Sequence, residues 1–292
     1  MKNSKVKEQT EKQNLKIGIV GLGLIGASFA LALNSKTEFE VLGFDIAKNT
    51  LNKAKKLNII KAVLDDKKLP TIDVLIFATN PRTTIKLFGK YVPYLKFGSI
   101  VFDLGGVKQT VCNEMWAYAD TYEYINFIGG HPMAGREFSG IDFADKNLFD
   151  NASMLLVDVK SDNVAKATLL YICTRIGFKE PKFTAASEHD KIIAYTSQGC
   201  HAISSAFCQN SLSLQHKGFS AGSFRDLTRV ARLNSNLWSE LFIDNKDNLA
   251  DCLDEFILTL QELNTKIKEG DEKAIKSFLE NGNIQKDKID KE

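Results

Sequence analysis

The chain has 292 residues, 44% of them hydrophobic and 25% charged, which is the composition of a globular protein with room for two domains. Its 38 basic and 36 acidic residues give a formal net charge of +2, so no broad positive surface for nucleic acid is expected. No apolar run approaches the roughly 18 to 20 residues of a membrane span, and the amino terminus lacks the apolar core of a signal peptide, so we expect a cytoplasmic protein without a membrane partner.

The first half of the chain alternates short apolar runs with stretches of helical spacing. Residues 1–14 precede this pattern; they are charged and lack periodicity, which predicts a disordered leader. The expected strands are residues 16–20, 40–44, 74–78, 100–103, 125–128 and 154–158, and a helix is expected after each of the first four. Because such alternation is typical of a parallel sheet, residues 15–185 are predicted as an α/β domain with a parallel-rich sheet.

The second half of the chain has the spacing of helices. Apolar residues recur at steps of three and four along one stretch: Leu249, Leu253, Phe256, Ile257, Leu260, Leu263 and Ile267. Residues 186–284 are therefore predicted as an all-α domain, and residues 285–292 as a disordered polar tail. Since a domain of roughly a hundred residues has little core of its own, we expect this stripe to form both a core and a homodimer interface.

A glycine-rich turn joins the first expected strand to the helix after it. The turn reads Gly21-Leu22-Gly23-Leu24-Ile25-Gly26, and its place between strand and helix is the context of a Rossmann dinucleotide fingerprint. Gly21 permits the tight turn, Gly23 lets the backbone approach a pyrophosphate, and Gly26 lets helix and strand pack closely. The start of the helix, with Leu24 and Ile25, offers unpaired N–H groups to the anion.

Asp45 ends the second expected strand, where a carboxylate accepts hydrogen bonds from the ribose hydroxyls of the cofactor. Because it repels a 2′-phosphate, it predicts NAD rather than NADP. A cap for the helix that starts near Ala47 is the alternative for Asp45. Thr79 and Asn80 follow another expected strand at the edge where parallel sheets place ligand loops, and both cofactor contact and a plain turn stay open for them.

His131 stands in the segment Gly129-Gly130-His131-Pro132-Met133-Ala134-Gly135, directly after an expected strand. It should therefore emerge at the carboxyl end of the sheet, on the ligand side. A neutral imidazole at this place is a suitable general base beside a redox cofactor, which indicates hydride transfer coupled to proton transfer. A merely structural, hydrogen-bonded histidine is the alternative.

The order of these motifs resembles that of the prephenate dehydrogenase family. After the Rossmann motif and the His131 segment come Ser187-Glu188-His189-Asp190, then His201, then Phe224-Arg225-Asp226-Leu227-Thr228-Arg229, and then Trp238. The resemblance covers residues 15–278. It implies an enzyme that oxidises prephenate with NAD and releases carbon dioxide, giving 4-hydroxyphenylpyruvate in tyrosine biosynthesis.

The resemblance also implies roles for individual residues. His131 is the expected catalytic base for the C4 hydroxyl, and Arg229 the arginine that grips a substrate carboxylate. His201 is expected as a second substrate-binding histidine, with Ser197 one helical turn before it. For His189 and Asp190, contact with a ligand and a helix-cap or packing role both stay open.

Three positions depart from the family pattern. Gly106, expected beside the cofactor, stands where the family usually carries a serine that touches the substrate hydroxyl and the nicotinamide. Gln198 replaces another histidine found in many members. Arg136 stands where a small polar residue is usual, and is either an extra carboxylate anchor for the substrate or an exposed surface arginine.

Three other functions stay open as alternatives. Arogenate dehydrogenase runs the same reaction on a substrate with an ammonium group, which Glu137 is able to pair with; we favour prephenate. A catalytically silent NAD-binding regulator and a β-hydroxyacid dehydrogenase, with Lys191 as its catalytic lysine, are the further alternatives. No metal is expected, because the five cysteines are scattered without a Cys-x-x-Cys pair.

Overall fold

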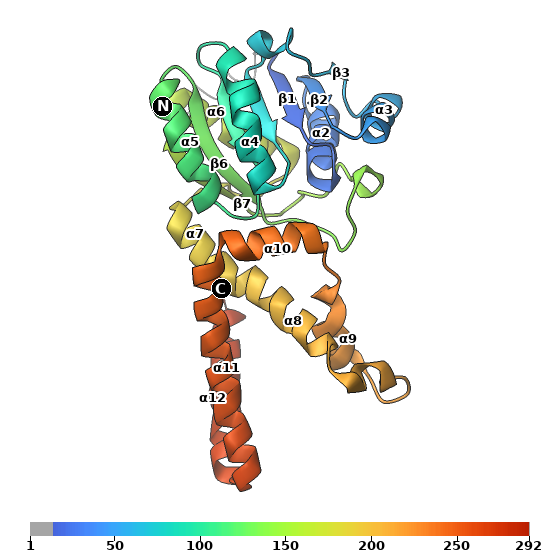
Figure 1. Ribbon diagram of the computed structural model, residues 1–292, viewed down its shortest axis with the longest axis vertical. Helices are drawn as coiled ribbons and strands as arrows, with labels where there is room; N and C mark the ends of the chain where they lie inside the picture. The colour runs from blue at the N-terminus through green and yellow to red at the C-terminus, as the bar shows by residue number, and fades with distance from the viewer. Residues whose placement is uncertain (1–13, 292) are drawn as a thin grey trace.

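The computed structural model describes residues 14–291 and places an α/β domain above a helical domain along its long axis (Figure 1). The predicted leader, apart from Asn14, lies outside the described residues. The two-domain fold class expected from the sequence is confirmed.

Eight strands of the described chain form one sheet, in the order β3-β2-β1-β4-β5-β6-β7-β8. Their bounds are β1 Lys16–Val20, β2 Glu40–Phe44, β3 Ala62–Val63, β4 Val74–Phe77, β5 Ile100–Asp103, β6 Asn126–Pro132, β7 Met154–Lys160 and β8 Lys182–Phe183. All six expected strands are present. The two strands that the pattern did not predict, β3 and β8, have two residues each, which is too short to show a periodicity.

The sheet is parallel except between β6 and β7, which pair antiparallel. The connection between them holds only the short 3₁₀ helix η3 (Ile141–Phe143) and no crossover helix, and a parallel pair needs such a crossover. In the parallel part of the sheet β1 lies between β2 and β4, so the strand order reverses at β1 and β4. Open α/β sheets bind ligands at the carboxyl ends of the strands at this point.

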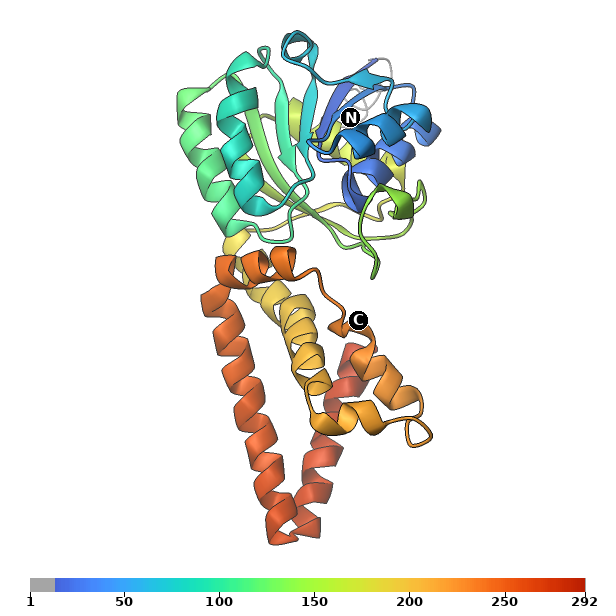
Figure 2. The same cartoon turned by 45° about the vertical axis from the view of Figure 1, so that its right-hand side comes forward.

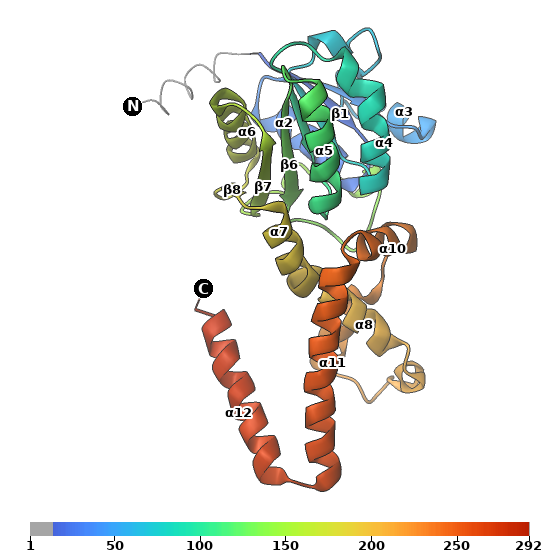
Figure 3. The same ribbon diagram turned by 60° about the vertical axis from the view of Figure 1, so that its left-hand side comes forward.

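Helices cover both faces of the sheet (Figure 3). On one face α2 (Leu24–Lys36) and α6 (Asn163–Ile176) pack with Ile19 and Ile76, and on the other α4 (Pro81–Tyr91) and α5 (Gln109–Thr121) pack with Leu75 and Phe77. The helix α3 (Lys48–Lys56) follows β2. Burial on both faces explains why the strands read as continuous apolar runs.

The carboxyl-terminal half is all helical. Its elements are α7 Ala186–Ile193, the π-helical segment η4 Ala194–Gly199, α8 Cys200–Cys208, η5 Ser211–Gln215, α9 Gly222–Thr228, η6 Arg229–Ala231, α10 Ser235–Asp244, α11 Lys246–Glu269 and α12 Glu272–Ile289. The prediction of a disordered tail from residue 285 is wrong, because residues 285–289 continue α12. An ion pair at i,i+4 between Lys286 and Asp290 supports this last turn.

The helical domain buries little apolar surface within one chain. Of the predicted stripe, Leu249 is 5% exposed, whereas Phe256, Ile257, Leu260 and Ile267 are between 40% and 56% exposed. From the junction with the α/β domain, α11 diverges from α8, the first helix of the arm formed by α8 and α9 (Figure 2). The stripe therefore contributes less to the core of a single chain than predicted. Within residues 14–291, no helix is long and apolar enough to cross a lipid bilayer.

Candidate active site

The glycine-rich turn has room for a side chain at its middle glycine but not at its first and last ones. Gly21 has φ 93°, and a Cβ atom there would lie 2.6 Å from the carbonyl oxygen of Ala78. A Cβ atom on Gly26 would lie 1.9 Å from the carbonyl oxygen of Gly21, whereas one on Gly23 would meet nothing within 4 Å. Only glycine fits at positions 21 and 26, whereas the open space at Gly23 leaves the backbone free for a ligand.

The amino end of α2 suits an anion. The helix begins at Leu24, its N-cap Gly23 provides no side-chain hydrogen bond, and its first turn contains no acidic residue. The first-turn N–H groups, those of Leu24 and Ile25 among them, have no partner within the helix. Together with the open space at Gly23, these groups fit the pyrophosphate of a dinucleotide.

Asp45 anchors the glycine-rich turn to the end of β2. Its Oδ2 atom accepts a hydrogen bond of 2.8 Å from the amide of Leu22, and its Oδ1 atom accepts one of 2.8 Å from the amide of Ala47. A carboxylate accepts about four hydrogen bonds, so both oxygens retain capacity for ribose hydroxyls. The N-cap of α3 is Ala47, and no side chain caps this helix, so Asp45 holds the turn before α3 and is not its cap.

Thr79 and Asn80 lie between β4 and α4. The Thr79 hydroxyl is 2.7 Å from the Thr84 hydroxyl, and Thr79 packs behind Gly21, where a Cβ atom would lie 2.8 Å from its Cγ2 atom. Asn80 is the N-cap residue of α4, but its side chain makes no capping hydrogen bond. Both residues stand at the carboxyl edge of the sheet beside the glycine-rich turn.

A buried ion pair holds the loop after β5 against the strand that carries His131. The side chains of Lys108 and Asp103 are 0% and 1% exposed and form a salt bridge. The Lys108 Nζ atom also donates a 2.7 Å hydrogen bond to the Gly130 carbonyl oxygen, and Asp103 accepts hydrogen bonds from the amides of Gly105 and Gly130. These additional bonds offset the cost of burying two charges.

His131 lies near the carboxyl end of β6, as predicted, and contacts another histidine. Its Nδ1 atom is 2.9 Å from the Nε2 atom of His189, and the Nδ1 atom of His189 is 2.7 Å from the Oδ1 atom of Asp190. Both His189 and Asp190 are buried, at 1% and 0% exposure. Two residues of the helical domain therefore support the candidate base of the α/β domain.

The imidazole of His131 is held neutral. Burial, the neighbouring His189 and the Lys108 ammonium lower the pKa of His131 well below its ordinary value of 6.5. A neutral ring at neutral pH is the form that accepts a proton.

The free nitrogen of His131 faces Gly106. A Cβ atom built on Gly106 would lie 3.8 Å from His131 Nε2 and 3.6 Å from a methyl carbon of Leu241 on α10. These are ordinary contact distances, so the structure has room for a serine at this position. The missing side chain leaves a space next to the candidate base.

His201 is held by its own helix and by Trp238. Its Nδ1 atom is 2.8 Å from the carbonyl oxygen of Ser197, and its ring centroid is 4.1 Å from that of Trp238. Trp238 and Leu241 are three residues apart on α10, so they lie on one face of that helix. One face of α10 therefore lies next to His201, through Trp238, and next to Gly106 beside His131, through Leu241.

Arg229 and Arg136 already have acidic partners. The Nη1 atom of Arg229 is 3.5 Å from Glu137 Oε1, and the two side chains are 61% and 46% exposed. Arg136 forms an ion pair with Asp145, whose backbone amide donates a hydrogen bond to the Ser28 hydroxyl oxygen on α2. Arg229 is thus the more available carboxylate anchor, because an exposed pair at 3.5 Å is weak.

Two further sequence candidates have different surroundings. Gln198 is 2% exposed; its side chain donates to the Leu241 carbonyl oxygen at 3.1 Å and accepts from Asn245 at 2.7 Å. It thus joins η4 to α10 and α11 as part of a buried network. Lys191 is exposed on α7.

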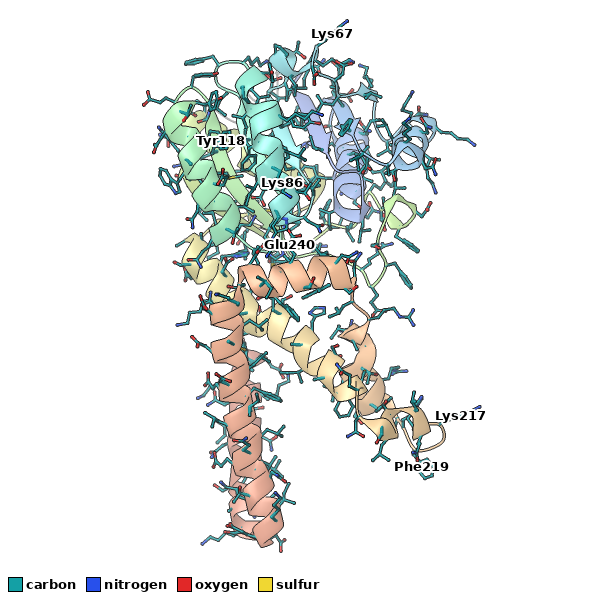
Figure 4. The ribbon with its side chains drawn as sticks, in the orientation of Figure 1. Lys67, Lys86, Tyr118, Lys217, Phe219 and Glu240 are labelled. Carbon is teal, nitrogen blue, oxygen red and sulfur yellow. The ribbon has the colours of Figure 1, made fainter. Side chains whose placement is uncertain are left out.

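Sequence reasoning missed the contact that joins α4 to α10. The amide of Arg82 donates to Glu240 at 2.8 Å, and its guanidinium pairs with Asp244 at 2.8 Å. Glu240 lies at the junction of the two domains (Figure 4). An arginine and two acidic residues on separate helices carry no signal in the sequence that could have paired them.

Comparisons with known proteins agree with this architecture. Residues 29–177 match the family profile "Prephenate dehydrogenase, nucleotide-binding domain", and residues 185–281 match "Prephenate dehydrogenase, dimerization domain". The prephenate dehydrogenase of Lactococcus lactis subsp. cremoris is 32% identical over 278 residues, which span 91% of this chain and 75% of the relative. The chain belongs to the prephenate dehydrogenase family. The family and the class of enzyme expected from the sequence are thereby confirmed, and the family profile describes the first domain as nucleotide-binding.

Solved structures share the fold over nearly the whole chain. Arogenate dehydrogenase from Synechocystis is 27% identical with a TM-score of 0.79, and the match covers 94% of this chain and 100% of that one. Prephenate dehydrogenase from A. aeolicus, in complex with hydroxyphenyl propionate and NAD+, is 24% identical with a TM-score of 0.84, over 95% and 99% of the two chains. Family members with either substrate in their names thus have this architecture.

Proposed function

We propose that this protein oxidises prephenate with NAD and releases carbon dioxide, giving 4-hydroxyphenylpyruvate for tyrosine biosynthesis. The observation that carries the proposal is the placement of His131 Nε2 beside Gly106, at the end of β6 and facing the helical domain. NAD, when bound, accepts the hydride. The residues that would hold it are the glycine-rich turn, Asp45, Thr79 and Asn80 after β4, and Gly106 after β5.

The proposed reaction needs a base at one atom of the substrate. The hydride leaves C4 of the ring, and the C4 hydroxyl gives its proton to His131 Nε2, forming a C4 carbonyl. The bond to the ring carboxylate then breaks, carbon dioxide leaves, and the electron pair of that bond makes the ring aromatic. The C4 oxygen becomes a phenolate, which takes the proton back to give the hydroxyl of the product. A positioned base contributes about 10²- to 10⁴-fold to such a step.

Four side chains are proposed to hold the two carboxylates and the keto group of the substrate. Arg229 grips one carboxylate, since a guanidinium binds it with two parallel hydrogen bonds. His201 and Ser197 line the side of the site that α8 and η4 form, and Trp238 keeps the His201 ring in place. Arg136 is the second candidate anchor, with Asp145 as the partner that it would have to release.

The test is NADH formation from prephenate by the wild-type chain and by His131→Asn. We expect turnover by the wild type and a loss in kcat of at least about a hundredfold in the variant. The exposed His216, hydrogen-bonded to Ser220, supplies the matched control, His216→Asn. NAD binding without turnover of either prephenate or arogenate would instead favour the silent regulator.

Arogenate is the alternative substrate, and one observation favours it. Glu137 lies beside Arg229, where a carboxylate is able to pair with the ammonium group that arogenate has in place of the keto oxygen. Initial rates with both substrates decide between them. Fast turnover of arogenate without turnover of prephenate would reverse our choice.

We further infer that the chain forms a homodimer through its helical domain. The exposed apolar residues of α11 and α12 and Phe219, 93% exposed at the tip of the α8–α9 arm, support this inference (Figure 4). Light scattering of the purified chain tests it, with twice the mass of one chain expected. All five cysteines are free, which fits the reducing cytoplasm as the proposed location.

A further inference from the structure

We propose that His189 and Asp190 are positioning residues that present the His131 Nε2 lone pair to the substrate and pass on the proton that His131 receives. This inference rests on the proposed function, because it concerns the same base. Its starting point is the hydrogen-bonded chain from His131 through His189 to Asp190, which joins β6 to α7.

The direction of each hydrogen bond follows from the last acceptor. A carboxylate oxygen only accepts, so the proton between His189 and Asp190 belongs to His189 Nδ1. In neutral His189 the other nitrogen, Nε2, is then an acceptor, so the proton between the two rings belongs to His131 Nδ1. His131 Nε2 is left without a proton, and this is the atom that faces Gly106.

The carboxylate of Asp190 is itself held by backbone donors. Its Oδ1 atom accepts from the amide of Lys108 at 2.7 Å, and its Oδ2 atom accepts from the amide of Gln109 at 2.8 Å, at the amino end of α5. Both the hydrogen bonds and the helix dipole favour a negative charge there. The expected capping role is thus real, but the capped helix is α5 and not α7.

The charged groups around the chain place an ammonium near His131 and a carboxylate against His189. The Lys108 ammonium opposes a positive charge on His131, and Asp103 is the carboxylate paired with that ammonium. His189 instead contacts the Asp190 carboxylate directly. Cys112, on α5, is a neutral thiol because burial raises its pKa to about 12.

The proposed step balances without a further reactant. The substrate hydroxyl gives its proton to His131 Nε2, and His131 gives its Nδ1 proton to His189 Nε2. His131 is then neutral again with the proton on Nε2, and His189 is an imidazolium paired with Asp190. Once carbon dioxide has left, reversal of these transfers returns the proton to the C4 oxygen, which becomes the product hydroxyl, and restores the starting state of both histidines.

The first test reads the tautomers without using activity. The full chain has four histidines, so a long-range ¹H–¹⁵N spectrum of protein labelled at histidine contains four rings, and His131→Asn and His189→Gln assign two of them. We expect Nδ1–H tautomers for His131 and His189 at neutral pH. A proton on His131 Nε2 would overturn the proposal.

The second test separates proton transfer from positioning. In His189→Gln the amide oxygen is still able to accept from His131 Nδ1, but the side chain takes up no proton. Single-turnover NADH formation is followed in mixtures of H₂O and D₂O, with His216→Gln as the matched control. We expect a curved dependence of rate on deuterium content in the wild type and control, and a straight line with a rate about ten- to a hundredfold lower in His189→Gln.

The outcomes distinguish this inference from the proposed function. A straight line in the wild type, or a His189→Gln rate within about twofold of it, overturns the relay while leaving His131 as the base. If neither prephenate nor arogenate is turned over, the proposed function fails, and the histidine spectrum still shows whether the chain of hydrogen bonds exists.

Discussion

Asp190 of the helical domain accepts a 2.7 Å hydrogen bond from the backbone amide of Lys108 in the α/β domain. Lys108 in turn donates to the carbonyl oxygen of Gly130, the residue before His131. The candidate base is thus held from both domains at once. Variants that loosen the contact between the domains are expected to reduce kcat even where they touch neither substrate nor cofactor.

Gly106→Ser is expected to fold normally and to raise kcat/KM. The added Cβ atom meets Leu241 and His131 only at ordinary contact distances, and the hydroxyl is able to hydrogen-bond near His131 Nε2. One net hydrogen bond of about 0.5–1.5 kcal/mol corresponds to a gain of about two- to tenfold. Gly106→Ala is the control, and an equal effect of both substitutions would show that the hydroxyl has no role.

The pH dependence of activity should reflect the lowered pKa of His131. Because this pKa lies well below 6.5, the base stays neutral as the pH falls through 6.5, where an ordinary histidine is half protonated. We expect the acidic limb of kcat/KM to fall only below pH 6.5. A midpoint at or above 6.5 would contradict the buried, neutral base.

The same pKa shift makes a prediction for stability. Below pH 6.5 the unfolded chain takes up a proton on residue 131 that the folded chain does not, so stability is complete above 6.5 and is lost as the pH falls toward the folded-state pKa. Urea unfolding at about pH 7.5 and about pH 5.5 measures this loss. His131→Asn should lose less stability between these two values than the wild type.

Glu137→Gln tests the partner of Arg229. Removing the carboxylate frees the guanidinium for the substrate, so the KM for prephenate should fall, by less than about fivefold because the pair is exposed. Turnover of arogenate should not improve, since a partner for its ammonium group is lost. The ratio of kcat/KM for the two substrates is the measurement, and a shift toward arogenate would refute this role.

Two glycines of the nucleotide turn should respond differently to alanine. Gly26→Ala places a Cβ atom 1.9 Å from the Gly21 carbonyl oxygen. We expect the free energy of unfolding to fall by about 1–3 kcal/mol and NAD binding to be lost as well. Gly23→Ala meets nothing within 4 Å, so stability should be unchanged while NAD affinity falls about tenfold. Calorimetry measures both, and unchanged NAD binding in Gly23→Ala would argue against a pyrophosphate at this position.

Much of the fold was predictable because its signals are local. The six longer strands are apolar runs. The spacing of the glycine-rich turn follows from close contacts within a few residues, because neither Gly21 nor Gly26 has room for a Cβ atom. The antiparallel return of β7 was not predictable from the runs themselves, because it depends on a connection without a helix.

The sequence by itself determined the two-domain order, the nucleotide turn and the position of His131 at the end of a strand, since each depends on neighbouring residues. Only the tertiary structure decided what supports His131. His189 follows it by 58 positions, and the two rings meet because α7 packs beside α5 and β6, bringing Asp190 onto the first amides of α5. Periodicity specifies which face of an element is apolar, but not which polar side chains from two domains meet at their contact.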